Sequence, residues 1–340
     1  MSKKTIAMLL VIALVGASLG MAGGAKEGAE AKPIYLKLGL ESNKESAQYK
    51  AMVAYKEYAE KKSNGRIKVD VFDSGQLGVD KEAVSMIKMG TVQGWDINTS
   101  LLSAIEPSFM IFDLPYMTTS QEELVKILEK NFGKFLSDKL VAKTEIMVAS
   151  WFVRGPRNVY GNKGPINSPK DMAGMKIRVM QNPIMVKTME LLGAKPVPLA
   201  ASERYMALQT GVVDAAEGVF SLVINQKEYE VAKFMSMTGH FNTPNCLIMD
   251  YRIYKNAAAE LKQIMDEAAK ECQRVSIETD KAMNDAGRKI LEEKGMKIND
   301  IADLTPFETL VKPLHDEYGP KIGKDVMDRF FALRKEVRGK

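Results

Sequence analysis

The chain has 340 residues and a formal net charge of +5, with 46% hydrophobic and 27% charged residues, a balance typical of a soluble globular protein large enough for two domains. Two cysteines exclude a disulfide framework and a cysteine-based zinc ribbon, and two histidines make a multi-histidine metal site a poor expectation. The charge excess is small and dispersed, so the sequence does not favour nucleic-acid binding.

The first residues form a predicted targeting segment. Residues 1–22 begin with two lysines, continue with the apolar run Ile6–Leu19 and end in a small-x-small pattern that a signal peptidase accepts. A membrane anchor is the alternative, but the run is shorter than the about 18–20 apolar residues that span a bilayer. We therefore expect a cleavable signal peptide, cut after Ala22 or Ala25, then a flexible leader over residues 23–31 and an exported, soluble mature protein.

The first part of the mature chain alternates strands and helices. Apolar and polar residues alternate in Ile34–Gly39 and in Ile67–Phe72, as they do in half-buried strands. The predicted elements are strand 34–39, helix 48–61, strand 67–72, helix 81–89 and strand 92–97. This β-α-β-α-β order is typical of a layered α/β domain.

A second α/β unit follows a predicted strand run over 141–154. Ser168 precedes Pro169, so we expect a short helix with Ser168 as its N-cap. Ser202 is expected to cap a further helix, which Gly211 ends. The other predicted elements are strand 175–180, helix 182–192, extended segment 194–199, helix 202–210 and strand 212–216.

One long segment stands apart from these units. From Ala257 to Glu293 there is no proline, the only glycine is Gly287, and apolar residues recur every three or four positions. A single helix of this length would be about 50 Å long, which exceeds the diameter of either α/β unit. The interpretations are one helix that spans both units, or two helices with a hidden kink.

The two cysteines are expected to be buried free thiols. Cys272 lies within the long helical pattern and Cys246 within a strand-like one. In an oxidising compartment a disulfide between them is the alternative.

No catalytic motif is present, and three charged residues are the candidates for binding. The sequence has no GxxxxGK[ST], GxSxG, HExxH or GxGxxG pattern, and we expect no enzyme activity, metal or cofactor. Arg178 points away from the apolar face of its predicted strand, near the carboxyl end, where ligands of α/β sheets bind. Arg157 follows a strand in the same way, and Glu41 ends the first one. Arginine suits carboxylate recognition, although a solvated surface charge is the alternative for each of the three.

Seven segments in a fixed order form a pattern over nearly all of the mature chain. They are Asn64–Val69, Gln76–Gly78, Asp113–Tyr116, Gly164–Ile166, Lys176–Val179, Gly193–Pro196 and Ala207–Asp214. In their order and spacing these segments resemble those of the DctP-type solute receptors of tripartite ATP-independent periplasmic (TRAP) transporters.

The resemblance implies an α/β fold of the two-lobed periplasmic-binding-protein kind, class II-like, with a long helix under both lobes and a ligand cleft between them. Lobe one would comprise residues 32–153 and 244–284, and lobe two residues 154–243 and 285–340. The ligand-binding residues carried over by position are Arg178 as the carboxylate clamp, Arg157 as a second basic residue, Glu41 and Asn98 from lobe one, and Glu217.

Two residues depart from the family pattern. Ala201 stands where the family usually has an aromatic residue, and Gly218 where it usually has asparagine. Both changes remove side-chain volume, so we expect a larger or differently placed ligand than in relatives. Trp151 or Trp95, near strand ends, could supply the missing ring, with core packing as the alternative for both.

The resemblance implies a monomeric periplasmic receptor that binds a small organic acid and delivers it to the TRAP permease. The sequence leaves two alternatives open. One is a sensory binding protein that docks on a receptor kinase, and the other is a secreted two-lobed enzyme.

Overall fold

The computed structural model describes residues 33–339. The expected signal peptide, 1–22, and leader, 23–31, therefore lie outside the described residues. Among the helices of residues 33–339, none is both long and apolar enough to cross a bilayer.

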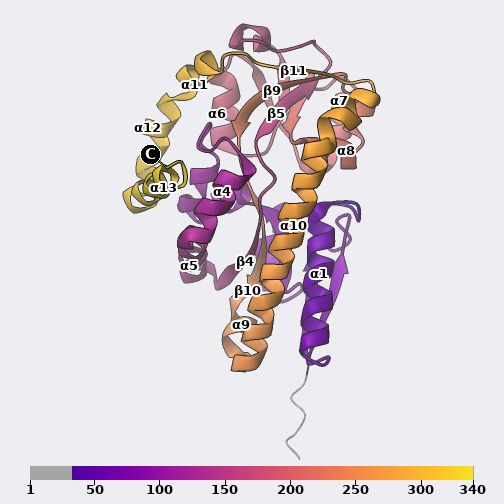
Figure 1. Cartoon of the computed structure of the whole chain (residues 1–340), viewed down its shortest axis with the longest axis vertical. Helices are drawn as coiled ribbons and strands as arrows, with labels where there is room; N and C mark the ends of the chain where they lie inside the picture. The colour runs from indigo at the N-terminus through magenta and orange to yellow at the C-terminus, as the bar shows by residue number, and fades with distance from the viewer. Residues whose placement is uncertain (1–32, 340) are drawn as a thin grey trace, which may run out of the picture. The chain divides into compact units, whose positions relative to one another are not determined.

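The described chain is a succession of short strands and helices with one long helix, α10 (Figure 1). The strands are β1 (Ile34–Gly39), β2 (Ile67–Phe72), β3 (Gly94–Asn98), β4 (Ile146–Phe152), β5 (Arg157–Gly161), β6 (Lys176–Val179), β7 (Lys195–Pro198), β8 (Ala215–Gly218), β9 (Phe234–Phe241), β10 (Asn245–Asp250) and β11 (Lys297–Asp300). The α-helices are α1 (Ala47–Lys62), α2 (Ala83–Lys88), α3 (Thr99–Leu102), α4 (Gln121–Ile127), α5 (Gly133–Thr144), α6 (Pro183–Leu191), α7 (Arg204–Gln209), α8 (Phe220–Asn225), α9 (Tyr251–Asn256), α10 (Ala259–Glu293), α11 (Thr305–Val311), α12 (Pro313–Ile322) and α13 (Lys324–Val337).

Two sheets organise these elements. The first has the order β2-β1-β3-β10-β4, with β1 parallel to β2 and β3, and β10 antiparallel to β3 and β4. The second has the order β11-β9-β5-β8-β6-β7. The chain passes between the sheets at residues 153–156, at 242–244 and along α10, so the predicted α/β fold with two layered sheets is confirmed.

The single-helix interpretation of the long segment is also confirmed. Helix α10 runs without a break over 35 residues and packs against α1 beside the first sheet and against α8 and β11 beside the second. In Figure 1 it extends past both sheets. Its inner face is apolar where it covers the first sheet, through Leu261, Met265, Ala268 and Cys272, and this burial supplies most of its stability.

Several local expectations need correction. The strand run expected from residue 141 is helical through Thr144, and Glu145, at φ 58°, ends α5 in a left-handed conformation before β4. The strand expected at 212–216 begins at Ala215. Ser202 is not a cap: the 3₁₀ turn η5 (Ala201–Glu203) starts after Ala200, whose N–H donates to Glu203 Oε2 at 2.8 Å. Cys246 and Cys272 are buried and free, as expected.

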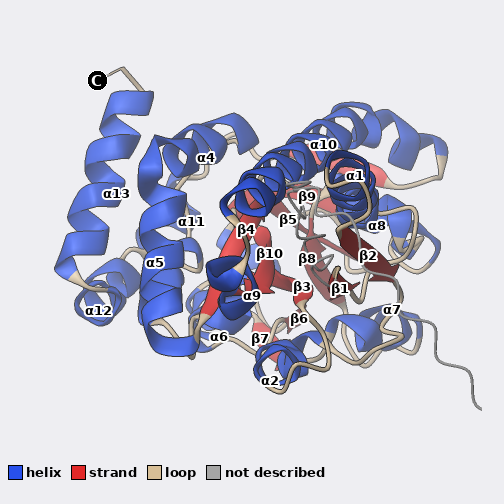
Figure 2. Cartoon of the chain, turned by 90° about the horizontal axis from the view of Figure 1, so that it is seen from below, coloured by secondary structure: helices blue, strands red, loops and turns tan. Residues whose placement is uncertain are grey.

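The C-terminal helices cover the side of the molecule away from α10. Helix α11 packs against α6, α12 against the 3₁₀ helix η2 (Pro107–Phe112), and α13 against α4 (Figure 2). Both η2 and α4 belong to the part of the chain expected in lobe one, whereas residues 285–340 were expected in lobe two. Residues 33–339 form one compact unit by their contacts, so the division into lobes stays a prediction.

Candidate functional site

A cavity of about 310 Å³ opens where the carboxyl ends of β1 and β3 face β6 and the start of β5. Four arginines and three carboxylates line it, together with neutral side chains. The charged lining residues are Arg154, Arg157, Arg178 and Arg204, which lie after β4, on β5, on β6 and on α7, and Glu41, Asp80 and Asp96, which belong to the segment from β1 to β3. We call the four arginines the basic wall and the three carboxylates the acidic wall.

Arg178 is the arginine of this wall that has no acidic partner. It is only 1% exposed, and its Nε and Nη2 donate to the Leu199 carbonyl oxygen at 3.1 and 2.6 Å. No carboxylate of residues 33–339 forms a salt bridge with it. Burial, with the charges of Arg204 and Arg157, lowers the pKa of Arg178 to about 10, so the guanidinium stays charged at neutral pH. A buried cation of this kind is stabilised by an anion that enters the cavity.

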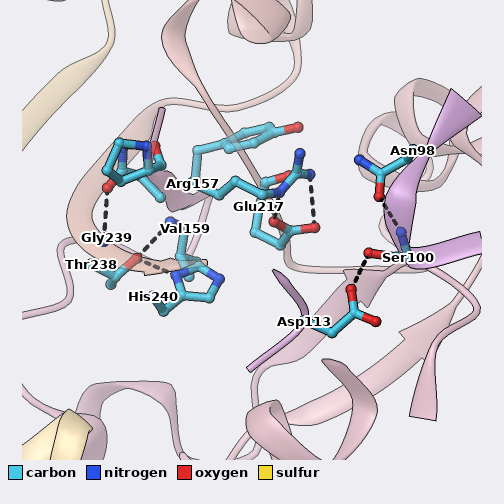
Figure 3. A network of polar contacts seen from close by, with 12 residues as sticks. Asn98, Ser100, Asp113, Arg157, Val159, Glu217, Thr238, Gly239 and His240 are labelled. Carbon is cyan, nitrogen blue, oxygen red and sulfur yellow. Dashed lines mark hydrogen bonds and ion pairs between the residues drawn. The ribbon is translucent and has the colours of Figure 1, made fainter. Parts of the chain in front are cut away.

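Arg157 already has a partner. Its Nη2 donates to Glu217 Oε1 at 2.9 Å and to the Glu217 carbonyl at 2.8 Å, and its Nε contacts Oε2 of the same carboxylate (Figure 3). Burial alone would raise the pKa of Glu217, but the charge and hydrogen bonds of Arg157 outweigh it and lower that pKa. The two side chains form a buried bidentate pair that leaves Arg157 neutralised.

His240 lies beside this pair, and it is neutral. Its Nδ1 is 2.8 Å from Thr238 Oγ1 (Figure 3), its Nε2 is buried without a hydrogen-bond partner, and burial lowers its pKa to about 4. His240 belongs to strand β9.

The acidic wall is held by neutral donors. The Trp95 indole donates to Asp80 Oδ1 at 2.8 Å, the Asp80 backbone N–H donates to Glu41 Oε1 at 3.3 Å, and Asn245 Nδ2 donates to both oxygens of Asp96 at 3.0 and 3.1 Å. Burial raises the pKa of Asp96 to about 6 and those of Glu41 and Asp80 above their usual values. Each carboxylate keeps acceptor capacity that faces the cavity.

Asn98 contributes from the end of β3. Its Nδ2 donates to Asn245 Oδ1 at 3.0 Å, and its Oδ1 caps α3 by accepting from Ser100 N at 3.0 Å (Figure 3). Both polar atoms of the amide are therefore engaged, which fixes Asn245 and, through it, Asp96.

Two arginines of the basic wall were not foreseen. Arg204 donates to Glu228 Oε1 at 2.7 Å, and Glu228 also accepts from the Tyr160 hydroxyl. Arg154 lies at the crossing from β4 to β5; its Nε is 4.0 Å from Asp280 Oδ2, and neither atom has a hydrogen-bond partner. Burial lowers the pKa of Arg154.

Five of the predicted site residues line the cavity, and three do not. The lining residues are Glu41, Asn98, Arg157, Arg178 and Ala201, which is exposed. Glu217 lies behind Arg157, and a Cβ added at Gly218 would point toward Leu222 and Tyr160, 3.2 and 3.3 Å away. At this position β8 faces the core, so a side chain at residue 218 would point away from the cavity.

The expectation that Trp151 supplies a ring to the ligand site is wrong, because the residue packs in the core. Its ring stacks on Phe109, with ring centroids 6.1 Å apart, and packs against Phe112 in the hydrophobic core. It lines a different cavity, between α5, β4 and α10, and takes no part in the site. Trp95 is buried as well, and its role at the cavity is to hold Asp80.

The comparisons with known proteins agree with this geometry. Residues 38–321 match the DctP family, described as bacterial extracellular solute-binding protein, family 7. The C4-dicarboxylate-binding periplasmic protein DctP of Rhodobacter capsulatus is 30% identical over 306 residues, which cover 87% of this chain and 90% of that protein.

Solved structures extend the likeness to the fold. A TRAP periplasmic solute-binding protein of Roseobacter denitrificans with bound β-D-glucuronate has a TM-score of 0.83 at 26% identity, over 88% of this chain and 99% of that one. The sugar acid binding protein DctPAm of Advenella mimigardefordensis, in complex with galactonate, has a TM-score of 0.85 at 26% identity, over 90% and 99%.

Proposed function

This chain belongs to family 7 of the bacterial extracellular solute-binding proteins, the receptors of TRAP transporters, and we propose that its ligand is a sugar-acid-sized carboxylate held between the two sheets. One observation carries the proposal. Arg178 is a buried, charged guanidinium that lines the cavity and has no acidic partner among residues 33–339.

The ligand carboxylate would pair with the N–H groups of Arg178 that do not donate to the Leu199 carbonyl, namely those of Nη1 and the second N–H of Nη2. Arginine presents its N–H groups in a planar fork that matches the two oxygens of a carboxylate. Because both groups are removed from water in the cavity, the attraction between them is stronger than it would be at the surface. The carboxylate thus stabilises a cation that the fold has already desolvated.

Hydroxyl groups along the ligand fit the opposite wall. Glu41, Asp80 and Asp96 offer carboxylate oxygens as acceptors, and Ser42, Ser202 and Gln226 add neutral polar groups. Relatives of the same fold hold glucuronate and galactonate, which carry one carboxylate and several hydroxyls. The exposed Ala201 leaves room beside Arg178 for such a chain or ring.

Delivery to a membrane permease in the periplasm completes the proposed function. No bond is made or broken; the ligand instead shifts an equilibrium between open and closed arrangements of the two sheets, by its differential affinity for the closed one. The connections at 153–156 and 242–244 and helix α10 are the segments about which such a motion would occur.

A thermal-shift panel tests the proposal. A ligand at 100 times its Kd adds about 2.7 kcal/mol, which raises the unfolding midpoint by several degrees on a scale of about 2–4 °C per kcal/mol. Sugar acids and other hydroxylated carboxylates should give this shift. Their amides and the corresponding neutral sugars, which match them in shape, should not. A shift by neutral sugars together with no shift by any carboxylate would refute the proposal.

A further inference from the structure

The charges of the cavity are unevenly matched. On the basic wall, Arg157 and Arg204 each hold a carboxylate of their own, Glu217 and Glu228. Arg154 has Asp280 at 4.0 Å, and within residues 33–339 Arg178 is the one arginine of this wall that forms no salt bridge with an acid. The basic wall therefore offers one strong place for an anion.

The charges of Arg154 and Arg178 act on the acidic wall, but its carboxylates form no ion pair within residues 33–339. No lysine or arginine of residues 33–339 forms a salt bridge with Glu41, Asp80 or Asp96. Their hydrogen-bond donors are neutral: an indole N–H, a backbone N–H and a side-chain amide. Trp95, which donates to Asp80, precedes Asp96 on β3, and this contact keeps Asp80 near Asp96. Both carboxyls line the same cavity as Glu41.

We infer that the ligand carries an ammonium group as well as a carboxylate, so that it is an amino sugar acid or a related zwitterion. The carboxylate would pair with Arg178, and the ammonium would lie against Glu41, Asp80 and Asp96. This inference rests on the proposed function and narrows the class of ligand.

Charge balance is the physical reason. With all carboxyls ionised, the four arginines are outnumbered by the three lining acids together with Glu217, Glu228 and Asp280. A purely anionic ligand would add to this negative charge, whereas a zwitterion leaves it unchanged and places each charge opposite its complement. An ammonium has three donors in a compact group, which suits several acceptors at once.

An organic cation fits this wall better than a metal ion does. Within residues 33–339, no group of three or more His, Cys, Asp or Glu side chains is arranged to hold a metal.

The pH dependence of binding distinguishes the two kinds of ligand. Burial raises the pKa values of all three carboxyls, that of Asp96 to about 6, and repulsion from Glu41 adds to the rise at Asp80 and at Asp96. An ammonium favours the ionised wall, so its binding releases protons and tightens as the pH rises from 5.0 to 7.5. An acid without the ammonium favours the protonated wall, so its binding weakens over the same range. The groups that face the wall are Arg154, Arg178 and Asp280; these act on both ligands and cancel in the ratio of their affinities.

Calorimetry with matched pairs is the test. Glucosaminuronate and glucuronate differ only in an ammonium for a hydroxyl at carbon 2, across the ring from the carboxylate at carbon 6, and galactosaminuronate and galacturonate form a second pair. The aminated member of the better-bound pair should bind about ten-fold tighter or more at pH 7.5, with the ratio shrinking at pH 5.0. Glu41→Gln and Asp96→Asn should each reduce the ratio several-fold, while Asp70→Asn, on a side chain 68% exposed on β2, should leave it unchanged.

Each outcome decides a separate point. Tighter binding of an aminated acid, with the stated pH trend, supports the inference. Equal or tighter binding of an amine-free acid, from these pairs or any other carboxylate, overturns the inference and leaves the proposed function standing. If no carboxylate binds at all, the proposed function fails, and the inference fails with it.

Discussion

Arg178 and Arg157 share the cavity but differ in what neutralises them. Arg157 has the Glu217 carboxylate against it, whereas the guanidinium of Arg178 meets only the Leu199 carbonyl. Truncation of the two side chains should therefore have different consequences. Loss of Arg178 removes the positive charge that we expect to pair with the ligand. Loss of Arg157 leaves the buried Glu217 carboxylate without its partner.

Arg178→Ala should lower ligand affinity by at least about 2–3 kcal/mol, because the bound carboxylate would lose its charge partner. Arg178→Lys should recover only part of this, since an ammonium lacks the planar pair of N–H donors. Titration calorimetry with the ligand found in the thermal-shift panel measures both. Arg66→Ala, on the surface beside Glu260, is the control and should bind as the parent does. If Arg178→Ala binds the ligand as tightly as the parent protein does, Arg178 does not bind the ligand carboxylate.

Ala201→Phe should weaken binding of the native ligand without a large change in the stability of the unliganded protein. The residue is exposed and lines the cavity, so a ring has room to form in the empty protein but takes space from the ligand. Calorimetry and thermal unfolding of the variant check the two parts separately. Unchanged or tighter binding would mean that Ala201 does not border the occupied space.

Glu217→Gln should destabilise the fold by about 3 kcal/mol, because it leaves Arg157 buried without its counter-charge. The pKa of Glu217 is lowered in the folded chain, so the pair contributes its full stability above the ordinary carboxyl pKa of 4.5 and loses it as the pH falls. Denaturant unfolding between pH 3 and 7 should show a flatter acid limb in the variant. A parent-like pH profile in Glu217→Gln would contradict the assignment.

At the scale of elements, helix α10 is stabilised by packing where intrinsic propensity works against it. Gly287 is buried opposite α8, and a Cβ added there would lie 2.4 Å from Phe220 Cβ. Helix propensity alone predicts that Gly287→Ala stabilises the protein by up to about 1 kcal/mol. The contact predicts the reverse, a loss of about 1–3 kcal/mol, because Phe220 Cβ is fixed to its backbone and α8 must shift.

Chemical denaturation of Gly287→Ala measures which effect dominates. Gly295→Ala is not a suitable control because its φ is 87°. Ala282→Gly, at an exposed position of the same helix, reports propensity without a packing change and should cost about 1 kcal/mol. Stabilisation by Gly287→Ala would show that α8 and α10 are less closely packed than the structure has them.

The elements that the sequence predicted well are those in which one local pattern decides the outcome. Alternation gave the bounds of β1 and β2, and uninterrupted helical spacing gave α10. The errors occur where the backbone departs from a pattern: at Glu145, which ends α5 in a left-handed conformation, and at Ala200, where a carboxylate caps the turn that Ser202 was expected to cap. The helices after α10 and the pairing of β10 between β3 and β4 depend on long-range packing, which spacing does not reveal.

The candidate site shows the same division. Arg178, Arg157, Glu41, Asn98 and Ala201 lie at strand ends or loops near the cavity, and their positions follow from the strand order and the family resemblance. Asp80, Asp96, Arg154 and Arg204 were not foreseen, because each becomes a lining residue only when the two sheets face each other. The one signal available was a charged residue at the end of a predicted strand run, as Arg154 is in 141–154.

At the scale of the whole molecule, a polar network joins the two halves away from the ligand space. Asn182, the N-cap of α6, donates to Asp113 Oδ2 at 2.8 Å and to the Ser100 carbonyl at 3.2 Å, across from the second sheet to α3 and η2. Helix α10 makes a second connection on the opposite side, where Asn284 donates to the Arg154 carbonyl at 2.8 Å. Arg154, whose side chain lines the cavity, is therefore attached to α10 through its backbone carbonyl.

Binding of the solute depends, in our proposal, on a carboxylate that lies against Arg178 in the cavity between the sheets. A crystal structure of the purified protein with its bound solute is the most direct measurement. We predict a carboxylate within hydrogen-bonding distance of the Arg178 guanidinium, between the β6 wall and the wall that carries Glu41. A solute bound elsewhere, or one that presents no carboxylate to Arg178, would contradict the account.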